Sequence, residues 1–386
     1  MSFSNWNYPT AMTAGIGALS ALPDACKSLG MERPLLVTDP GIAELSMTQE
    51  ARDLCEQQGL SVALFCDVQG NPTGQNVEAG NTAYNEGLHD GVIALGGGSA
   101  LDCAKAIALS AEQSLPLWAF EDVGDNWTQA DSDLIAPIVA IPTTAGTGSE
   151  VGRASVITKE DEKRKLIIFH PKMLPEKVIL DPELTVGLPA HITAATGMDA
   201  LSHSLEALCA PGYHPMAEGI AIEGIRLVQQ NLPIVFENGA DKQARMQMLV
   251  ASSMGATAFQ KGLGAMHAIA HTLGALYNAH HGLLNAILMP YVLEANRSEI
   301  DDKMDRLSRY LSLEASGTDA VLNWVLALRR SLGIPHTLGE IGINDVEAEK
   351  VGLMSINDPS AGGNPIPFSA DEYSKLFVNA VHGKGL

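Results

Sequence analysis

The sequence predicts a two-part fold, with an α/β domain over residues 1–184 and an all-helical domain over residues 185–386. Three observations lead to this prediction. The chain has 386 residues, which is too long for one ordinary hydrophobic core. Short apolar runs alternate with helix-like segments in the first half, which is typical of a parallel sheet covered by helices. After Leu188 and Pro189, long segments rich in Ala, Leu, Met and Glu continue without a convincing strand.

Buried strands are expected where a short apolar run stands between turn residues. In chain order these runs are 34–39, 61–65, 91–95, 137–141 and 177–181. Helix-like segments at 47–58 and 76–87 separate them, so we expect right-handed crossovers between parallel strands. Residues 155–158 and 166–169 flank the charged segment KEDEKRK and predict a hairpin. The linker to the helical domain is expected near 181–189.

The composition limits the partners and the compartment. A formal net charge of −21 argues against nucleic acid or an anionic membrane as a partner. The N-terminal MSFSNWNYPT has no signal-peptide features, and no apolar run is long enough for a transmembrane helix. The cysteines are scattered without a CxxC pair, which favours reduced thiols in the cytoplasm. They are Cys26, Cys55, Cys66, Cys103 and Cys209.

A glycine-rich turn at 96–99 follows the third predicted strand and precedes a helix expected to begin at Ala100. Glycines let the backbone approach a phosphate closely, and a helix N-terminus attracts anions. Ser99 and Asp102 have the spacing of a capping box. The turn lacks the GxGxxG pattern of the ordinary dinucleotide fingerprint. Taken alone, it is equally well interpreted as a tight turn before a capped helix.

A second loop, rich in Thr and Gly, covers residues 141–150 after another predicted strand. Two such loops at the ends of parallel strands favour a ligand at the carboxyl edge of the sheet. Asp39 ends the first strong strand. A carboxylate there would accept hydrogen bonds from a ribose and repel a 2′-phosphate, which favours NAD over NADP. The alternative is that Asp39 is a turn residue before Pro40.

The helical half carries acidic and histidine residues in a pattern typical of metal ligands. Asp199 and His203 are four residues apart, and His267 and His271 repeat this spacing, so each pair shares a helix face. Two further histidines follow at 280–281. One such histidine alone would more often be a core residue. Carboxylate and imidazole groups grouped in apolar sequence suit a divalent transition metal, which acts as a Lewis acid where one position stays open.

Together these segments resemble the iron-containing (group III) alcohol dehydrogenases over nearly the whole chain. The matching segments are NPT at 71–73, GGGSALD at 96–102, PTTAGTGSE at 142–150, DPELT at 181–185, TAATGMDALSH at 193–203 and the histidine block at 267–281. The resemblance implies an N-terminal α/β dinucleotide-binding domain and a C-terminal all-α metal-binding domain, a dehydroquinate synthase-like architecture with the active site in the cleft between them. It also implies NAD as cofactor, Fe²⁺ as the usual metal, with Zn²⁺ or another divalent ion possible, and a homodimer.

The resemblance assigns roles to individual residues. The implied metal ligands are Asp199, His203, His267 and His281. His271 matches a histidine that relays protons, whereas His280 matches no ligand. The implied cofactor contacts are Asp39, Asn71, Gly97, Gly98, Ser99, Asp102, Thr143, Thr144, Thr147, Val156 and Lys165. The full ligand set argues against the related maleylacetate reductases, which lack it.

The substrate is less constrained than the metal. The GSEVGR and FQKGLG runs resemble the 4-hydroxybutyrate dehydrogenase branch of the family. Their cations, Arg153 and Lys261, would suit the carboxylate of a short ω-hydroxy acid. The alternative is that Arg153 pairs with Glu150 or another acid and that Lys261 is a solvated helix residue. Ser360 matches a region that lines the family's pocket and is a further candidate for substrate contact.

The predicted reaction is NAD-dependent, metal-dependent hydride transfer between a small primary alcohol and its aldehyde. An ω-hydroxy acid dehydrogenase is the alternative within the same class. An NAD-using lyase of the dehydroquinate synthase type is less favoured, because the helical half has few Lys and Arg residues near the histidine block to bind a phosphate-bearing substrate. Nothing in the sequence favours a non-catalytic binding module, for which a proton-relaying histidine would be superfluous.

Overall fold

The structure is a computed structural model of the chain and describes residues 9–162 and 164–386. The chain divides into two compact units that meet between Gly187 and Leu188. Residues 9–187 are called the α/β unit below, and residues 188–386 the helical unit. The division lies three residues beyond the boundary expected at 184 and 185. The predicted fold class is confirmed, since a parallel sheet fills the first unit and the described residues of the second form helices only.

A six-stranded parallel sheet with the order β1-β8-β5-β4-β2-β3 forms the centre of the α/β unit. Its strands are β1 Ala11–Ala14, β2 Leu35–Val37, β3 Ala63–Phe65, β4 Val92–Gly96, β5 Ile138–Pro142 and β8 Lys177–Leu180. The antiparallel hairpin, β6 Ala154–Lys159 and β7 Arg164–Phe169, lies where it was predicted. Sequence reasoning missed β1, whose four residues are exposed and carry no buried apolar run. Pairing with β8 makes it a strand.

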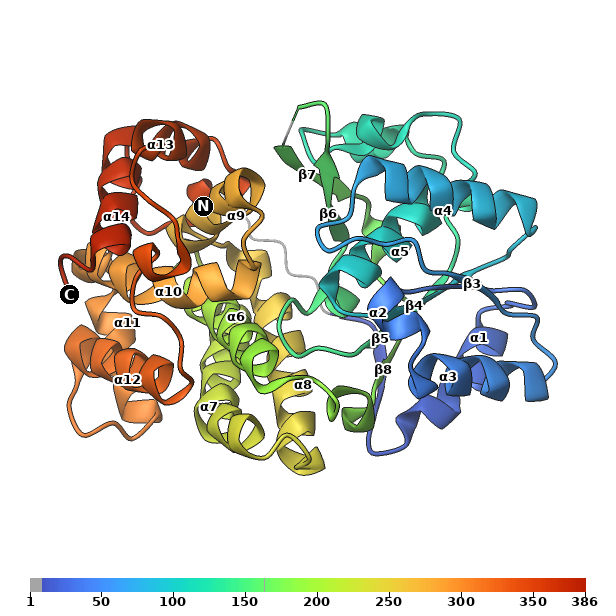
Figure 1. Cartoon of the computed structure of the whole chain (residues 1–386), viewed down its shortest axis with the longest axis horizontal. Helices are drawn as coiled ribbons and strands as arrows, with labels where there is room; N and C mark the ends of the chain where they lie inside the picture. The colour runs from blue at the N-terminus through green and yellow to red at the C-terminus, as the bar shows by residue number, and fades with distance from the viewer. Residues whose placement is uncertain (1–8, 163) are drawn as a thin grey trace. The chain divides into compact units, whose positions relative to one another are not determined.

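Helices cover both faces of this sheet (Figure 1). They are α1 Leu22–Ser28, α2 Pro40–Ala43, α3 Ser46–Gln57, α4 Gly74–Glu86 and α5 Gly98–Ser110. Side chains of α1 and α3 form one core with Leu36, Ile93, Val139 and Ile179, one residue from each of four neighbouring strands. Helices α4 and α5 lie on the opposite face. The two apolar layers hold the strands in register, so their carboxyl ends form one edge.

The chain order reverses between β2 and β4. From β2 the chain continues outward to β3, then returns past β2 to β4 and goes on to β5. Connections therefore leave the carboxyl ends of β2 and β4 in opposite directions. Such a switch point leaves a crevice beyond the strand ends, where open α/β sheets bind their ligands.

The helical unit is built around α6, which packs against α7, α8 and α10 and is buried along most of its length. Its helices are α6 Ala190–Cys209, α7 Pro215–Glu237, α8 Lys242–Ala258, α9 Ala265–Tyr277, α10 His281–Ala295, α11 Arg297–Tyr310, α12 Gly317–Ser331, α13 Ala348–Ile356 and α14 Ala370–His382. No helix among the described residues is both long and apolar enough to cross a membrane. Because neighbours surround α6, most of its polar residues are buried as well, including Asp199, His203 and Glu206.

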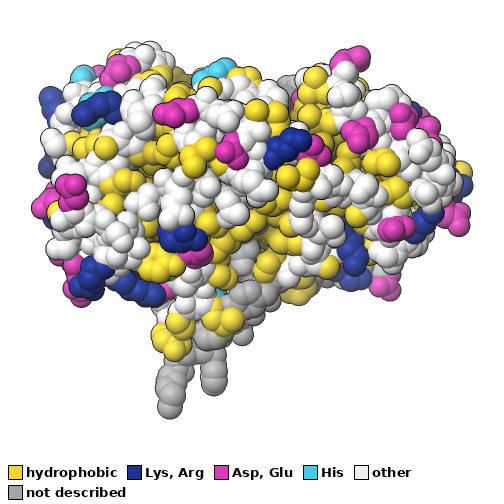
Figure 2. Space-filling view, turned by 90° about the horizontal axis from the view of Figure 1, so that it is seen from below, with side chains coloured by type: hydrophobic (Ala, Val, Ile, Leu, Met, Phe, Trp, Pro, Cys, Tyr) yellow, Lys and Arg dark blue, Asp and Glu magenta, His cyan; other side chains and the backbone are white. Residues whose placement is uncertain are grey.

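One face of the molecule carries acidic and basic side chains interspersed (Figure 2). On the face shown in Figure 2, Asp and Glu side chains alternate with Lys and Arg side chains. The described residues of that face form no basic stripe of the kind that nucleic acids bind.

Candidate functional site

Four side chains of the helical unit converge on one point. Asp199, His203, His267 and His281 each offer one ligand atom, and these atoms all lie within 4.8 Å of one another. Asp199 and His203 share a face of α6, His267 lies in the first turn of α9, and His281 begins α10. One carboxylate oxygen and three imidazole nitrogens are a donor set that divalent transition metals accept.

Gly282 lets α10 approach α6 closely enough to place His281 beside Asp199. A Cβ atom on Gly282 would lie 2.4 Å from the Ala195 carbonyl oxygen and 3.1 Å from the Asp199 Cβ. Any larger residue would therefore push the start of α10 away from α6. With glycine there, His281 Nε2 lies 3.6 Å from Asp199 Oδ1.

The electrostatics of the cluster favour an ionised carboxylate. Burial alone would raise the pKa of Asp199, but His203, His281 and His267 outweigh burial and lower the pKa to about 2. Burial would likewise lower the pKa of His267, but nearby carboxylates, first Glu206, raise it. A metal ion would therefore compete with a proton for His267.

Asn285 lies among the ligand atoms and was missed by sequence reasoning. Its Nδ2 donates to Asp199 Oδ1 at 2.9 Å and lies 3.2 Å from His267 Nε2 and 3.1 Å from His281 Nε2. Its Oδ1 is buried without a hydrogen-bond partner among the described residues. The side-chain NH₂ group of Asn285 thus faces the acceptor atoms of the cluster, while the side-chain oxygen of Asn285 has no hydrogen-bond donor among the described residues. The donor set and this unpaired oxygen fit a site that takes a cation. In the sequence, only its position four residues after His281, on the same helix face, indicated that Asn285 belongs to the site.

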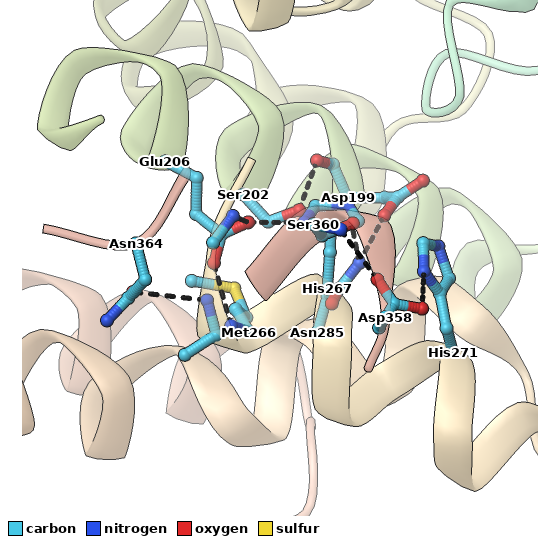
Figure 3. A network of polar contacts seen from close by, with 12 residues as sticks. Asp199, Ser202, Glu206, Met266, His267, His271, Asn285, Asp358, Ser360 and Asn364 are labelled. Atoms are coloured by element: carbon cyan, nitrogen blue, oxygen red, sulfur yellow. Dashed lines mark hydrogen bonds and ion pairs between the residues drawn. The ribbon is translucent and has the colours of Figure 1, made fainter. Parts of the chain in front are cut away.

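His271, four residues beyond His267, does not join the cluster of four. Its Nδ1 lies 3.0 Å from Asp358 Oδ2 (Figure 3). Its ring stacks on that of His281, with the centroids 5.2 Å apart. Burial would raise the pKa of Asp358, but His271 outweighs burial and lowers it. Asp358 also accepts a bond from the Ser360 amide at 2.8 Å, which places Ser360 beside this pair. No local pattern pointed to Asp358, which is far from His271 in sequence.

His280 has a structural role. It is the N-cap of α10, where its Nδ1 accepts a hydrogen bond from the Leu283 amide at 3.4 Å. The interpretation that His280 is not a ligand agrees with this position.

In the α/β unit the two predicted loops lie side by side at the carboxyl edge of the sheet. A Cβ on Gly97 would lie 3.4 Å from Thr144, and one on Gly98 would lie 2.5 Å from Thr147 Oγ1. The Thr143 amide donates to the Gly96 carbonyl at 2.9 Å. These glycines are therefore close-approach positions as well as turn residues, and they place the start of α5 against the second loop.

Three other predicted cofactor residues also come together. Lys165 Nζ donates to Asn71 Oδ1 at 2.7 Å, and the Asn71 amide donates to Ser99 Oγ at 3.3 Å. Asn71 has a φ of 60°, in the left-handed region that asparagine tolerates better than most residues. The hairpin is thus tied to the glycine-rich turn.

Asp39 stands at the end of β2, at the switch point. Its Oδ1 accepts bonds from the Gly41 and Ile42 amides at 2.9 and 3.1 Å, so it caps the short helix α2. Its Oδ2 has no hydrogen-bond partner among the described residues. The turn interpretation and the ribose interpretation are therefore compatible, because each needs a different oxygen.

The capping box expected between Ser99 and Asp102 is wrong. Helix α5 begins at Gly98 with Gly97 as its N-cap, two residues earlier than expected, and has no side-chain cap. Asp102 instead accepts bonds from Ser149 Oγ at 2.5 Å and the Val156 amide at 2.9 Å. The structure thus joins two predicted cofactor residues, Asp102 and Val156, to each other.

Both cations proposed for the substrate have partners in the structure. The buried Lys261 Nζ lies 2.8 Å from Glu218 Oε1 and 3.3 Å from the Leu208 carbonyl. Arg153 lies over the Phe169 ring at 5.6 Å. These contacts favour the structural interpretation of Lys261 over both a solvated residue and a carboxylate clamp.

The parallel sheet with its paired small-residue loops and the buried carboxylate–imidazole cluster are features of metal-dependent enzymes with a dinucleotide-binding fold. Comparison with known proteins agrees. The family description "Iron-containing alcohol dehydrogenase" matches residues 9–182, and "Fe-containing alcohol dehydrogenase family, C-terminal" matches residues 193–381. The chain belongs to the iron-containing alcohol dehydrogenase family, as predicted, and is an oxidoreductase acting on CH–OH donors.

The similarity to individual relatives is full-length. The chain is 39% identical to a 4-hydroxybutyrate dehydrogenase of Cupriavidus necator, over 97% of this chain and 99% of the relative. It is 32% identical to an NAD-dependent methanol dehydrogenase of Bacillus methanolicus, over 98% of this chain and all of the relative. Among solved structures, a 1,3-propanediol oxidoreductase superposes with a TM-score of 0.93 at 32% identity, covering 98% and 100% of the two chains.

Proposed function

We propose that this chain interconverts a small primary alcohol and its aldehyde, with NAD as the hydride carrier and a divalent metal, Fe²⁺ in the first place, held by Asp199, His203, His267 and His281. The observation that carries the proposal is the convergence of these four ligand atoms within 4.8 Å. A divalent metal at such a site supplies Lewis-acid chemistry, which favours loss of the hydroxyl proton from the alcohol.

NAD is supported by the α/β unit. The glycine-rich loop at the end of β4 lies at the switch point, where dinucleotides bind in such sheets, and the threonine-rich loop at the end of β5 lies next to it. We assign the eleven predicted residues of this unit to the cofactor site. Of these, Asp102 and Val156 act by holding the hairpin against α5, since the Val156 amide donates to Asp102 Oδ2. The relative from Bacillus methanolicus is named as NAD-dependent.

His271 is the candidate for moving the proton. An ionised carboxylate only accepts hydrogen bonds, so Asp358 receives Nδ1–H and leaves Nε2 of His271 free to take a proton. The side chain is 17% exposed, so the proton can pass on to water.

A short ω-hydroxy acid is the second candidate substrate. It is favoured by the 39% identity to a relative named 4-hydroxybutyrate dehydrogenase. Arg153 is the cation that remains for its carboxylate, because Lys261 is held by Glu218. Ser360, beside Asp358, remains a candidate for substrate contact.

We also propose a homodimer in the cytoplasm. The edge strand β1 exposes all four residues on a sheet edge with no described strand beyond it, which is a natural place for a second copy to pair. The five cysteines are free, and four of them are buried, which suits a reducing compartment.

The test is NADH formation by protein loaded anaerobically with Fe²⁺, comparing 1-butanol and 1,4-butanediol with 4-hydroxybutyrate. Metal-dependent turnover of the neutral alcohols supports the main proposal. A strong preference for the hydroxy acid, lost in Arg153→Ala, supports the second candidate. No metal-dependent NADH from any of the three would refute both.

A further inference from the structure

We infer that Glu206 is a positioning residue for His267: its carboxylate holds the imidazole in the one tautomer and orientation that leaves Nε2 free for a metal. Glu206 lies outside the short segments that carry the resemblance to the family. The inference rests on the proposed metal site, and the experiments below separate its failure from a failure of that site.

Glu206 belongs to the same face of α6 as two of the ligands. It follows Asp199 by seven residues and His203 by three, a spacing that places all three side chains on one face. The residue is only 6% exposed. Its carboxylate lies at the N-terminus of α9, the helix that carries His267 (Figure 3).

The carboxylate receives hydrogen bonds from two directions. Oε2 lies 2.6 Å from His267 Nδ1 and accepts from the Gly264 amide at 2.8 Å, and Oε1 accepts from the Met266 amide at 2.7 Å. Two backbone donors and a helix N-terminus stabilise a negative charge at this buried position. The charge is thus held in place without the metal.

This arrangement selects the tautomer of His267. An ionised carboxylate has no hydrogen to donate, so the bond at Nδ1 requires Nδ1–H. The opposite nitrogen, Nε2, has an N–H donor near it, since Asn285 Nδ2 lies 3.2 Å away. The contacts with Glu206 and with Asn285 both require that Nε2 of His267 carries no hydrogen, and Nε2 is the atom that belongs to the ligand cluster. A carboxylate behind a ligating histidine both fixes its ring and raises its basicity.

Glu206 also caps α9, and this role has to be separated from positioning. The N-cap residue Gly264 has no side chain, so Glu206 and Asn364 supply the missing acceptors. Asn364 Oδ1 accepts from the Ala265 amide at 3.1 Å and from Asn296 Nδ2 at 3.0 Å, and none of the hydrogen bonds of Asn364 to the described residues involves a proposed metal ligand. Asn364→Ala therefore removes a cap from the same helix turn without touching His267, and is the matched control for Glu206→Gln.

The first experiment titrates the metal-free protein with Co²⁺ and follows its visible ligand-field absorption, alongside calorimetry. Glu206→Gln should bind about 10–100-fold more weakly than wild type, the usual effect of losing such a partner. Its Co²⁺ spectrum should also change, because the His267 ring is no longer fixed. Asn364→Ala should bind within about threefold of wild type, although it unfolds at a lower temperature.

Equal Co²⁺ binding by Glu206→Gln and wild type would overturn the inference. An equal loss in Asn364→Ala would also overturn it, since capping alone would then explain the effect. Failure of the wild type itself to bind metal would instead refute the proposed metal site.

A second measurement needs no variant at position 206. Two-bond ¹H–¹⁵N spectra of metal-free wild type with labelled histidine, assigned with His267→Gln and recorded at a pH high enough for this imidazole to be neutral, should show His267 with hydrogen on Nδ1 and a bare Nε2. The opposite tautomer would overturn the inference even if Glu206→Gln does not fold.

Discussion

Removal of the buried ammonium of Lys105 should destabilise the α/β unit strongly. Its Nζ lies 3.3 Å from Asp102 Oδ1, donates to the Ser149 carbonyl at 3.1 Å and bonds the Ala154 carbonyl. The side chain is 1% exposed. Burial lowers the pKa of Lys105, although Asp102 and Glu150 oppose this shift. The ammonium therefore joins α5 to the second loop and to β6.

Lys105→Met keeps the volume of the side chain but removes one partner of a buried ion pair. Leaving a buried charge without its partner costs about 3–5 kcal/mol. For a unit of this size, 1 kcal/mol corresponds to roughly 2–4 °C, so the unfolding midpoint should fall by about 6–20 °C. Asp102 keeps its bonds from Ser149 and Val156, which places the expected loss toward the lower end of that range.

Differential scanning calorimetry of metal-free wild type, Lys105→Met, Asp102→Asn and the double variant would check this. The double variant should lose about 1–3 kcal/mol less than the sum of the single losses, because neither charge is then left alone. A drop in the unfolding midpoint of less than about 3 °C in Lys105→Met, or strictly additive losses in the double variant, would show that Lys105 and Asp102 do not stabilise the fold as an ion pair.

Three further outcomes are expected. His267→Ala should lower turnover by more than about 100-fold while circular dichroism stays unchanged, and retained turnover would contradict the metal assignment. Asp39→Gly should admit NADP in steady-state assays at a stability loss of only a few tenths of a kcal/mol, since glycine is a tolerable N-cap; NADP turnover that stays absent would contradict the ribose role. Hydrogen bonds, first from Arg226 and also from Tyr310, lower the pKa of Glu223 to about 2, so the folded state holds this group's proton less tightly than the unfolded chain does. The stabilisation that ionised Glu223 gives the folded state should be complete above about pH 4.3 and should vanish toward pH 2. The melting temperatures of wild type and Glu223→Gln should therefore converge as the pH falls through that interval. A constant difference between them would contradict the lowered pKa.

The sheet was largely predictable because its central strands are buried on both faces. Runs such as 91–95 must be apolar throughout, and this pattern is visible in one sequence. Strand β1 was not predictable, since its residues are exposed and only pairing with β8 makes it a strand. The start of α5 was misplaced because Ser99 looked like a cap, whereas the turn is closed by Gly97 in an extended conformation.

The ligand cluster was predictable to the extent that its residues follow helical spacing. Asp199 and His203 share a face by arithmetic alone. Spacing also places His271 beside His267, and their ring centroids lie 5.8 Å apart, but His271 pairs with Asp358 from a distant segment and does not join the four ligand atoms. The contacts of Glu206 and Asp358 depend on how α6, α9 and the segment after α13 pack. Packing also decided the role of Lys261, which the sequence offered as a cation for the substrate but which pairs with Glu218 in the structure.

The carboxylates of the helical unit give the cluster its order before any metal binds. Three of the imidazoles lie within 4 Å of an acidic side chain: His267 of Glu206, His271 of Asp358 and His281 of Asp199. These pairs hold the imidazoles in place, so the helical unit should fold without a cation even though Asn285 Oδ1 stays unsatisfied. Metal binding then adds stability only by mass action, in proportion to the logarithm of metal concentration over the dissociation constant. Chelation should therefore abolish turnover while leaving a folded helical unit, and the ligands should take up metal again without refolding, because their geometry is set by these pairs rather than by the ion.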